Sequence, residues 1–424
     1  MKAIGIDLGT TSICGVVIDT DSDAVLRSET VNSNAFVTTE NEWEKAQDVS
    51  LIIEKALKIV DEFIDDDVAV IGITGQMHGI LYYDSEGKAV SRLYTWQDGR
   101  GNLPYKDTTY AAYLGSASGY GNVTDFYNRE NSLVPPTAVG YCTVHDYLAM
   151  TLTGRRTPLV HTSDAASFGC FDIESNTFSY PCSIDVTAGF DTAGEYRGIP
   201  VSVAIGDNQA SVFSSLASDD DILINVGTGS QVSVISDVPV KGENIESRPF
   251  FDGKYLVVGA ALCGGRAYSL LKDFYSGVFA AAGITDVDVY AVMDKMLEKA
   301  DGELKVDTRF DGTRSDPSLS GSITGIKTSN FTAGNLTKGL LEGMVNELFN
   351  MYQNMNAVKK GIVGSGNGVR KNPQLVSAAE KKFGSRMSVP AHLEEAAYGA
   401  AMYGLVACGK FTSGEVRKLI RYNR

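Results

Sequence analysis

The chain has 424 residues, 43% of them hydrophobic and 21% charged, a composition typical of a globular protein with two or more domains. Its formal net charge of −15 argues against nucleic acid as a partner, because no excess of basic residues is present to neutralise a phosphate backbone. The six cysteines are scattered without a CxxC pair, so we expect neither a zinc site nor a disulfide framework.

The chain begins with a strand–turn–strand pattern at residues 3–19, AIGIDLGTTSICGVVID. Asp7 interrupts the apolar run early, so we expect no secretory signal, no membrane span and a cytoplasmic protein. The turn offers unhindered backbone N–H groups and hydroxyls that suit phosphate oxygens, and Asp7 could hold water on a magnesium ion. Its residues are Gly9, Thr10, Thr11 and Ser12. An ordinary polar hairpin, with Gly9 supplying a positive φ, is the alternative.

A helical pattern at residues 49–64 precedes a predicted strand at 68–74, and polar side chains follow that strand. They are Gln76, Met77 and His78, and then Trp96, Gln97, Asp98 and Arg100. Asp98 can accept hydrogen bonds from two hydroxyls of a ligand, Arg100 can orient Asp98, and Trp96 can cover an apolar face of that ligand. A lone histidine or tryptophan would more often be structural. Asp164 is equally compatible with a loop-forming Asx turn.

The stretch VAIGDNQAS at residues 203–211 ends an apolar run with a glycine and an aspartate. Asp207 could cap the helix predicted to follow, because aspartate accepts hydrogen bonds from the first free backbone N–H groups of a helix. It could also be a general base at the mouth of a cleft. The stretch alone leaves both interpretations open.

The strand–turn–strand pattern recurs at residues 222–236, with a turn of Gly227, Thr228 and Gly229. A second such loop strengthens the phosphate-binding interpretation, because a cleft between two halves would bring both turns to one polyphosphate. A helical pattern at 336–355 leads to a predicted strand at 361–366 and a turn containing Gly364, Gly366 and Asn367, where a base or ribose could approach the backbone. A tight turn with no further function is the alternative there.

Alternating strands and helices predict α/β domains with mixed sheets, residues 1–212 and 213–424, joined by a hinge near 207–219. The small residues at 394–404 favour a closely packed helix over a ligand contact.

These motifs, in this order, resemble the FGGY carbohydrate kinases. GIDLGTTS is similar to the family's first phosphate loop, NVGTGSQ to its second, and GSGNGVRKNP to its adenosine loop. ITGQMHGILYYD, TWQDGR, HDYLAMTLTG, SDAASFGCFD and AIGDNQASV resemble the sugar-side segments of members that phosphorylate sedoheptulose or xylulose. The resemblance runs from residue 3 to about residue 404. It implies two actin-like ATPase (ribonuclease H-like) domains with a central cleft.

The resemblance further implies ATP and Mg²⁺ as cofactors, Asp207 as the catalytic base, and Asp7 on the metal through water. Met77, His78 and Asp98 match the family's ketose-binding positions. The implied reaction is ATP-dependent phosphorylation of sedoheptulose to sedoheptulose 7-phosphate, with xylulose or another ketose or polyol as the alternative substrate. The stretch before His145 is shorter than is usual in the family, which leaves the sugar open.

Two alternatives come from other classes of protein. A catalytically silent sugar sensor would not need the base Asp207, and an actin-like filament or chaperone ATPase would not need the polar residues at 76–78 and 96–100. The expected partners are therefore a small ketose and ATP, with no nucleic acid and no membrane. The expected assembly is a monomer or a homodimer.

Overall fold

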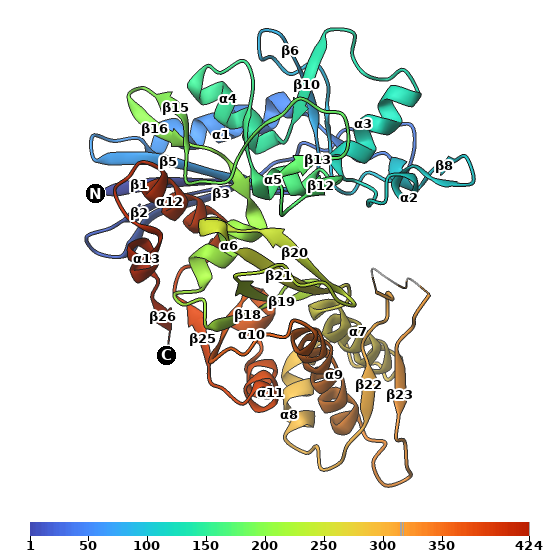
Figure 1. Cartoon of the computed structure of the whole chain (residues 1–424). Helices are drawn as coiled ribbons and strands as arrows, with labels where there is room; N and C mark the ends of the chain where they lie inside the picture. The colour runs from blue at the N-terminus through green and yellow to red at the C-terminus, as the bar shows by residue number, and fades with distance from the viewer. Residues whose placement is uncertain (314–315, 317, 424) are drawn as a thin grey trace. The chain divides into compact units, whose positions relative to one another are not determined.

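The computed structural model describes residues 1–313, 316 and 318–423 as an α/β protein of two compact units, each with its own mixed β-sheet (Figure 1). The first unit consists of Met1–Ala217, Arg248–Lys254 and His392–Arg421, and the other described residues form the second unit. None of the helices in the described part of the chain is long and apolar enough to cross a membrane.

The sheet of the first unit has the strand order β15-β16-β5-β1-β2-β3, with β17 paired to the C-terminal end of β5. β1 (Lys2–Leu8) runs antiparallel to β2 (Ser12–Asp19) and parallel to β5 (Val68–Gly75). These strands are almost wholly buried, as their continuous apolar sequences predict. The others are β3 (Ala24–Asn32), β15 (Thr192–Tyr196), β16 (Ile199–Ser202) and β17 (Ile205–Gly206).

Helices of the first unit cover this sheet with their apolar faces. α1 (Val49–Phe63) begins where the Asp48 side chain accepts a hydrogen bond from the backbone N–H of Leu51, and it buries Ile52, Ala56 and Ile59. The other helices are α2 (Tyr110–Tyr113), α3 (Gly121–Glu130), α4 (Val144–Thr153), α5 (Thr162–Ser167), α6 (Asp207–Ser215), α12 (Glu395–Ala407) and α13 (Ser413–Val416).

Short two-stranded ladders lie in the chain between β3 and β15. They are formed by β4 (Ala46–Gln47), β6 (Leu81–Asp84), β7 (Leu93–Tyr94), β8 (Pro104–Tyr105), β9 (Thr108–Thr109), β10 (Ala138–Cys142), β11 (Leu159–His161), β12 (Phe171–Asp172), β13 (Thr177–Phe178) and β14 (Asp185–Thr187). These ladders and their connecting loops carry the polar residues at 76–78 and 96–100.

Small residues let α12 lie directly on the backbone of the first sheet. A β-carbon at Gly5 of β1 would overlap the carbonyl oxygen of Ala397, and one at Gly72 of β5 would overlap that of Ala400. On another side of α12, a β-carbon at Gly399 would overlap the carbonyl oxygen of Ala210 in α6. The close-packing interpretation of residues 394–404 is therefore confirmed.

The sheet of the second unit has the strand order β20-β21-β19-β18-β24-β25-β26. The strands are β18 (Asp221–Val226), β19 (Ser230–Ser236), β20 (Ile245–Pro249), β21 (Tyr255–Ala261), β24 (Gly361–Ser365), β25 (Met387–Pro390) and β26 (Tyr422–Asn423), and a separate ladder joins β22 (Lys305–Asp307) to β23 (Ser322–Thr324). The helices are α7 (Gly265–Ala281), α8 (Val289–Leu297), α9 (Ala333–Asn354), α10 (Gly366–Lys371) and α11 (Pro373–Phe383). Their apolar faces form one core with the sheet.

The division between the units differs from the predicted domains 1–212 and 213–424. It falls after Ala217, and two later segments, Arg248–Lys254 and His392–Arg421, belong to the first unit. The physical reason is packing: α12 lies on β1 and β5, and Phe250 and Phe251 pack edge-to-face against Phe213 of α6.

The contact between β5 and α12 yields a stability prediction. We expect Gly72→Ala to lower the free energy of unfolding by about 1–3 kcal/mol, because the new methyl group must push the backbone of α12 away. The matched control is Gly414→Ala in α13, where a β-carbon would meet open space and should cost nothing. Urea denaturation followed by circular dichroism measures both variants, and equal midpoints would contradict the packing argument.

Candidate active site

Asp207 is the first residue of α6, and Gly206 occupies the N-cap position without a side-chain hydrogen bond. The interpretation of Asp207 as the N-cap is therefore wrong. β17 pairs Ile205 with Thr74 and Gly206 with Gly75, which places the start of α6 beside the end of β5. Since residues 76–78 leave that same strand end, the fold brings Asp207 next to the predicted sugar-binding residues.

Asp7 and Asp207 lie close enough to influence each other's ionisation. Burial raises the pKa of Asp7 to about 7, and the negative charge of Asp207 adds to this effect. Burial raises the pKa of Asp207 to about 6, while the nearby positive charges of His145 and Arg248 hold it lower than burial alone would. Both residues are half-buried, and a pair of carboxylates with near-neutral pKa values is typical of a catalytic site.

His145 and Asp164 form a buried ion pair next to Asp207, with His145 Nε2 3.0 Å from Asp164 Oδ1. Burial alone would lower the pKa of His145, but the carboxylates of Asp164, Asp146 and Asp207 outweigh it and raise the pKa to about 9. The carboxylate of Asp164 thus pairs with an imidazolium, and the Asx-turn alternative does not describe it. Nothing in the spacing of the two residues along the chain signals this pair.

The same region fits a hard divalent cation. Oδ1 of Asp7 is shielded from solvent and has no hydrogen-bond partner within the described part of the chain. Carboxylate oxygens and water are the ligands that Mg²⁺ prefers, and a cation would relieve the repulsion between Asp7 and Asp207.

The predicted first phosphate loop is joined to the predicted sugar-binding residues by hydrogen bonds. Thr10 Oγ1 donates to Gln76 Oε1 at 3.3 Å and accepts from Trp96 Nε1 at 3.0 Å. The backbone carbonyl of Thr10 accepts from Gln47 Nε2 at 2.6 Å. Thr11 at the tip is exposed, and Gly9 and Ser12 are half-buried. Trp96 is also 46% exposed, so one ring face remains accessible.

His78 is held in an unusual conformation beside this loop. Its φ of +74° lies in the left-handed region, which non-glycine residues adopt at a cost. Its Nδ1 lies 2.8 Å from the carbonyl oxygen of Ser167, and its ring stacks on Tyr120 with centroids 4.2 Å apart. Because a carbonyl only accepts, Nδ1 carries the proton in this hydrogen bond. Met77 lies against Gly206: a β-carbon at Gly206 would be 2.8 Å from the Met77 sulfur.

Asp98 and Arg100 are bound to each other more tightly than the sequence predicts. Oδ1 of Asp98 accepts from the backbone N–H and Nε of Arg100, at 3.1 and 2.6 Å. Oδ2 accepts from the backbone N–H of Lys45 at 3.0 Å and from Nη2 of Arg100 at 3.1 Å. Both side chains are buried. A sugar hydroxyl could reach Asp98 only by replacing one of these four donors.

The second unit contains a cavity of about 850 Å³ at the ends of β18 and β24. Of the predicted nucleotide-binding residues, Gly227, Thr228, Gly366 and Asn367 line it, whereas Gly229 and Gly364 do not. Gly364 instead makes room for Met387, whose sulfur would overlap a β-carbon there. Gly366 has a φ of +81° and lies against the backbone of Val226, so a side chain is excluded on two grounds.

Other lining residues belong to the two loops recognised in the sequence but were not named singly there: Val226, Gly368, Lys371 and Asn372. The sequence analysis missed the remaining ones, which are Gly265, Arg266, Tyr268, Ser269, Tyr290, Asp294, Met344 and Leu375. The backbone N–H groups of Gly265 and Arg266, at the start of α7, donate at 3.0 Å to the carbonyls of Gly227 and Thr228. Gly264 and Gly265, at the start of α7, could have indicated that this segment lines the cavity, because the pair resembles the glycine-rich turns recognised at the other strand ends.

Comparison with known proteins agrees with this geometry. Residues 2–105 match the FGGY family of carbohydrate kinases, N-terminal domain. The chain is 28% identical to the sedoheptulokinases of Mus musculus and Homo sapiens, and each match covers 94% of this chain and 96% of the relative.

Among solved structures, a xylulose kinase from Rhodospirillum rubrum aligns over 100% of this chain and 93% of its own, with a TM-score of 0.86 and 19% identity. That likeness concerns the fold alone, and it confirms the fold that the motifs implied. The matched N-terminal domain, together with the similarity to sugar kinases over nearly the whole chain, indicates that the protein is a sugar kinase with an FGGY-type N-terminal domain.

Proposed function

We propose that this sugar kinase transfers the γ-phosphoryl group of ATP to a ketose, with sedoheptulose as the substrate and sedoheptulose 7-phosphate as the product. The observation that carries the proposal is the position of Asp207, at the start of α6 and beside Met77 and the strand end that leads to His78. The identity of 28% to two sedoheptulokinases over nearly the whole chain supports sedoheptulose. Xylulose or another ketose is the alternative substrate.

In the proposed reaction Asp207 removes the proton from the attacking sugar hydroxyl. The hydroxyl oxygen forms a bond to the γ-phosphorus of ATP, the bond from that phosphorus to the bridging oxygen breaks, and ADP leaves with the electron pair. The proton ends on Asp207, whose pKa of about 6 keeps it mostly ionised at neutral pH and still able to accept a proton. A bound Mg²⁺, held by Asp7 through water, would neutralise charge on the phosphates.

We assign a positioning role to the His145–Asp164 pair. Its two charges nearly cancel, but after burial the imidazolium has the largest effect on Asp207, whose pKa it lowers. Without this cation, Asp207 would retain its proton to a higher pH and would be a poorer acceptor at neutral pH.

We assign the nucleotide to the cavity of the second unit and the sugar to the first. The backbone N–H and hydroxyl of Thr228 suit phosphate oxygens, and the stacked rings of Tyr268 and Tyr290, 5.7 Å apart, provide a flat apolar wall for the base. In the first unit, Gln76, His78 and Trp96 are proposed to contact the sugar. Asp98 and Arg100 are proposed to hold these three sugar-binding residues in place.

The first test is Asp207→Asn. The amide keeps the shape of the carboxylate and cannot accept the proton, so we expect kcat to fall by at least about a hundredfold while sugar and ATP still bind. Coupled assay of ADP release gives kcat, and calorimetry gives the two affinities. A variant that keeps more than about a tenth of the activity would show that Asp207 is not the base.

The second test is the pH dependence of kcat/KM for the sugar. The base must be ionised, so activity should be full above the pKa of Asp207 and should fall about tenfold per pH unit below pH about 6. An ordinary aspartate, with a pKa of 3.8, would keep activity to much lower pH. In His145→Gln the fall should begin at higher pH, because the charge that lowers the pKa of Asp207 is gone. A profile that is flat down to pH 5 would contradict the assignment.

The third test concerns the sugar. We expect His78→Ala to raise KM for the ketose about tenfold or more and to leave KM for ATP nearly unchanged, because a lost hydrogen bond leaves a sugar hydroxyl unpaired. Trp43→Phe, at the far side of Arg100, is a control that changes an aromatic ring without touching the proposed contacts. Sedoheptulose should be used best, xylulose less well and glycerol hardly at all. An aldose or glycerol as the best substrate would overturn the sugar assignment and leave the kinase activity standing.

A further inference from the structure

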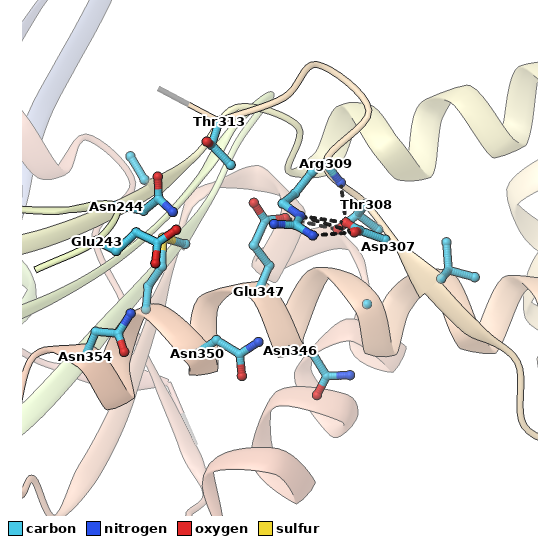
Figure 2. A pocket seen from close by; sticks show the side chains of 14 residues that line it. Glu243, Asn244, Asp307, Thr308, Arg309, Thr313, Asn346, Glu347, Asn350 and Asn354 are labelled. Carbon is cyan, nitrogen blue, oxygen red and sulfur yellow. Dashed lines mark hydrogen bonds and ion pairs between the residues drawn. The ribbon is translucent and has the colours of Figure 1, made fainter. Parts of the chain in front are cut away.

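The second unit contains another cavity, of about 340 Å³, which shares no lining residue with the proposed nucleotide cavity (Figure 2). Its size lies in the range of about 300–1,000 Å³ that small-molecule sites occupy. The lining residues are Glu243, Asn244, Ala260, Val306, Asp307, Thr308, Arg309, Thr313, Gly343, Asn346, Glu347, Asn350, Met351 and Asn354. Most of them are polar, which is unusual for a cavity that only reflects imperfect packing.

One face of α9 supplies the floor of this cavity. Asn346, Asn350 and Asn354 follow each other at intervals of four residues, so they lie on one face of the helix. Gly343, one turn earlier, lets the helix approach β22 so closely that a β-carbon would overlap the carbonyl oxygen of Val306. The close approach of α9 and β22 therefore fixes the amides relative to the wall formed by residues 307–309.

Among the described residues that line the cavity, no cation is left free for an anionic ligand. The guanidinium of Arg309 is held by both carboxylate oxygens of Asp307, at 2.9 Å from Nε to Oδ1 and 2.6 Å from Nη2 to Oδ2. Glu347 accepts from Thr308 Oγ1 at 3.1 Å, and burial raises the pKa of this carboxyl group. Glu243 has no ion pair within the described part of the chain. Phosphates and carboxylates would therefore meet net repulsion.

The amide of Asn346 is half-buried in this cavity, and those of Asn350 and Asn354 are exposed to solvent. Across the described ranges, the side chains of Asn346, Asn350 and Asn354 have no hydrogen-bond partner. Each amide offers two donors and an acceptor, whereas Glu243 and Glu347 add acceptors only. An ammonium group only donates and would leave the amide N–H groups unsatisfied, but a hydroxyl group both donates and accepts. Met351, Val306 and Ala260 add an apolar surface for carbon atoms.

We infer that this cavity is a binding site for an uncharged polyhydroxylated small molecule, a free sugar or a polyol. The site is separate from the proposed catalytic sugar site, because all of its residues belong to the second unit. The ligand is held by hydroxyl groups that bridge Glu347 and the amides of α9.

The test uses the full chain and three probes that share one ring and differ in charge: glucose, glucosamine and glucose 6-phosphate. Saturation-transfer NMR with titration gives the affinity of each, and sorbitol is a fourth, acyclic probe. We expect glucose or sorbitol to bind and the phosphate not to bind. Glu347→Gln should weaken binding about tenfold, since a hydrogen bond to a charged group is lost, and Asn350→Ala should weaken it less.

Two control variants locate the signal. Gln353→Ala changes an exposed residue of α9 outside the cavity, and His78→Ala changes the proposed catalytic sugar site, and both should leave this binding intact. The inference is overturned if neither neutral probe gives a signal that depends on Glu347 and Asn350. Tighter binding of glucosamine or glucose 6-phosphate through these residues would overturn it too, as would loss of the whole signal in His78→Ala. Absence of kinase activity would contradict the proposed function but not this binding site, so the two proposals can be tested independently.

Discussion

Buried charge is the constraint on which the first unit depends. Asp7, Asp146, Asp164 and Asp207 bring four carboxylates into its interior around a single imidazole, and removing a carboxylate from water is costly unless a positive group lies nearby. His145, 3.0 Å from Asp164, is the cation that makes this possible. It offsets the cost of burial only in part, since the pKa of Asp164 is still raised, and the pKa values of Asp7 and Asp207 are raised to about 7 and about 6. The fold therefore holds two carboxylates ready to bind a cation or take up a proton, which a purely structural core would avoid.

The second constraint is that backbone groups must be able to contact a ligand directly, without side chains in between. A protein with a net charge of −15 has no excess of Lys and Arg to attract a polyphosphate, so the attraction must be local. In the second unit the N-terminus of the 17-residue helix α7 meets the turn at Gly227, and Gly366 lies against the backbone of Val226. A helix N-terminus and exposed N–H groups together provide positive potential without charged side chains. The acidic composition is thus compatible with a nucleotide while it disfavours nucleic acid.

Local patterns predicted the elements well, because periodicity and capping are local. The helix predicted at 49–64 is Val49–Phe63, and the strand predicted at 361–366 is Gly361–Ser365. Long-range docking was not predictable in this way: nothing in residues 394–404 tells which sheet the helix will cover.

Asp98 and Arg100 illustrate a second limit. The sequence suggested that Asp98 contacts the sugar and that Arg100 orients it. In the folded chain Arg100 does hold Asp98, but its hydrogen bonds occupy both carboxylate oxygens, which sequence spacing does not reveal. Tyr268 and Asp294 were missed because they reach one cavity from different helices.

The hydrogen bonds between Asp98 and Arg100 affect how selective the proposed sugar-binding surface can be. Arg100 lies with its guanidinium 4.2 Å from the ring of Tyr94 and bonded to Asp98 and Asn128, so its position is determined from every side. Trp96, Thr10 and Gln76 form a connected chain of hydrogen bonds above it. His78 holds a costly left-handed backbone only because Ser167 and Tyr120 over-determine its place. Groups fixed in this way lose little entropy when a ligand binds, and they cannot shift to accommodate a misplaced hydroxyl. Discrimination would then come from the rigidity of the wall more than from the number of its contacts.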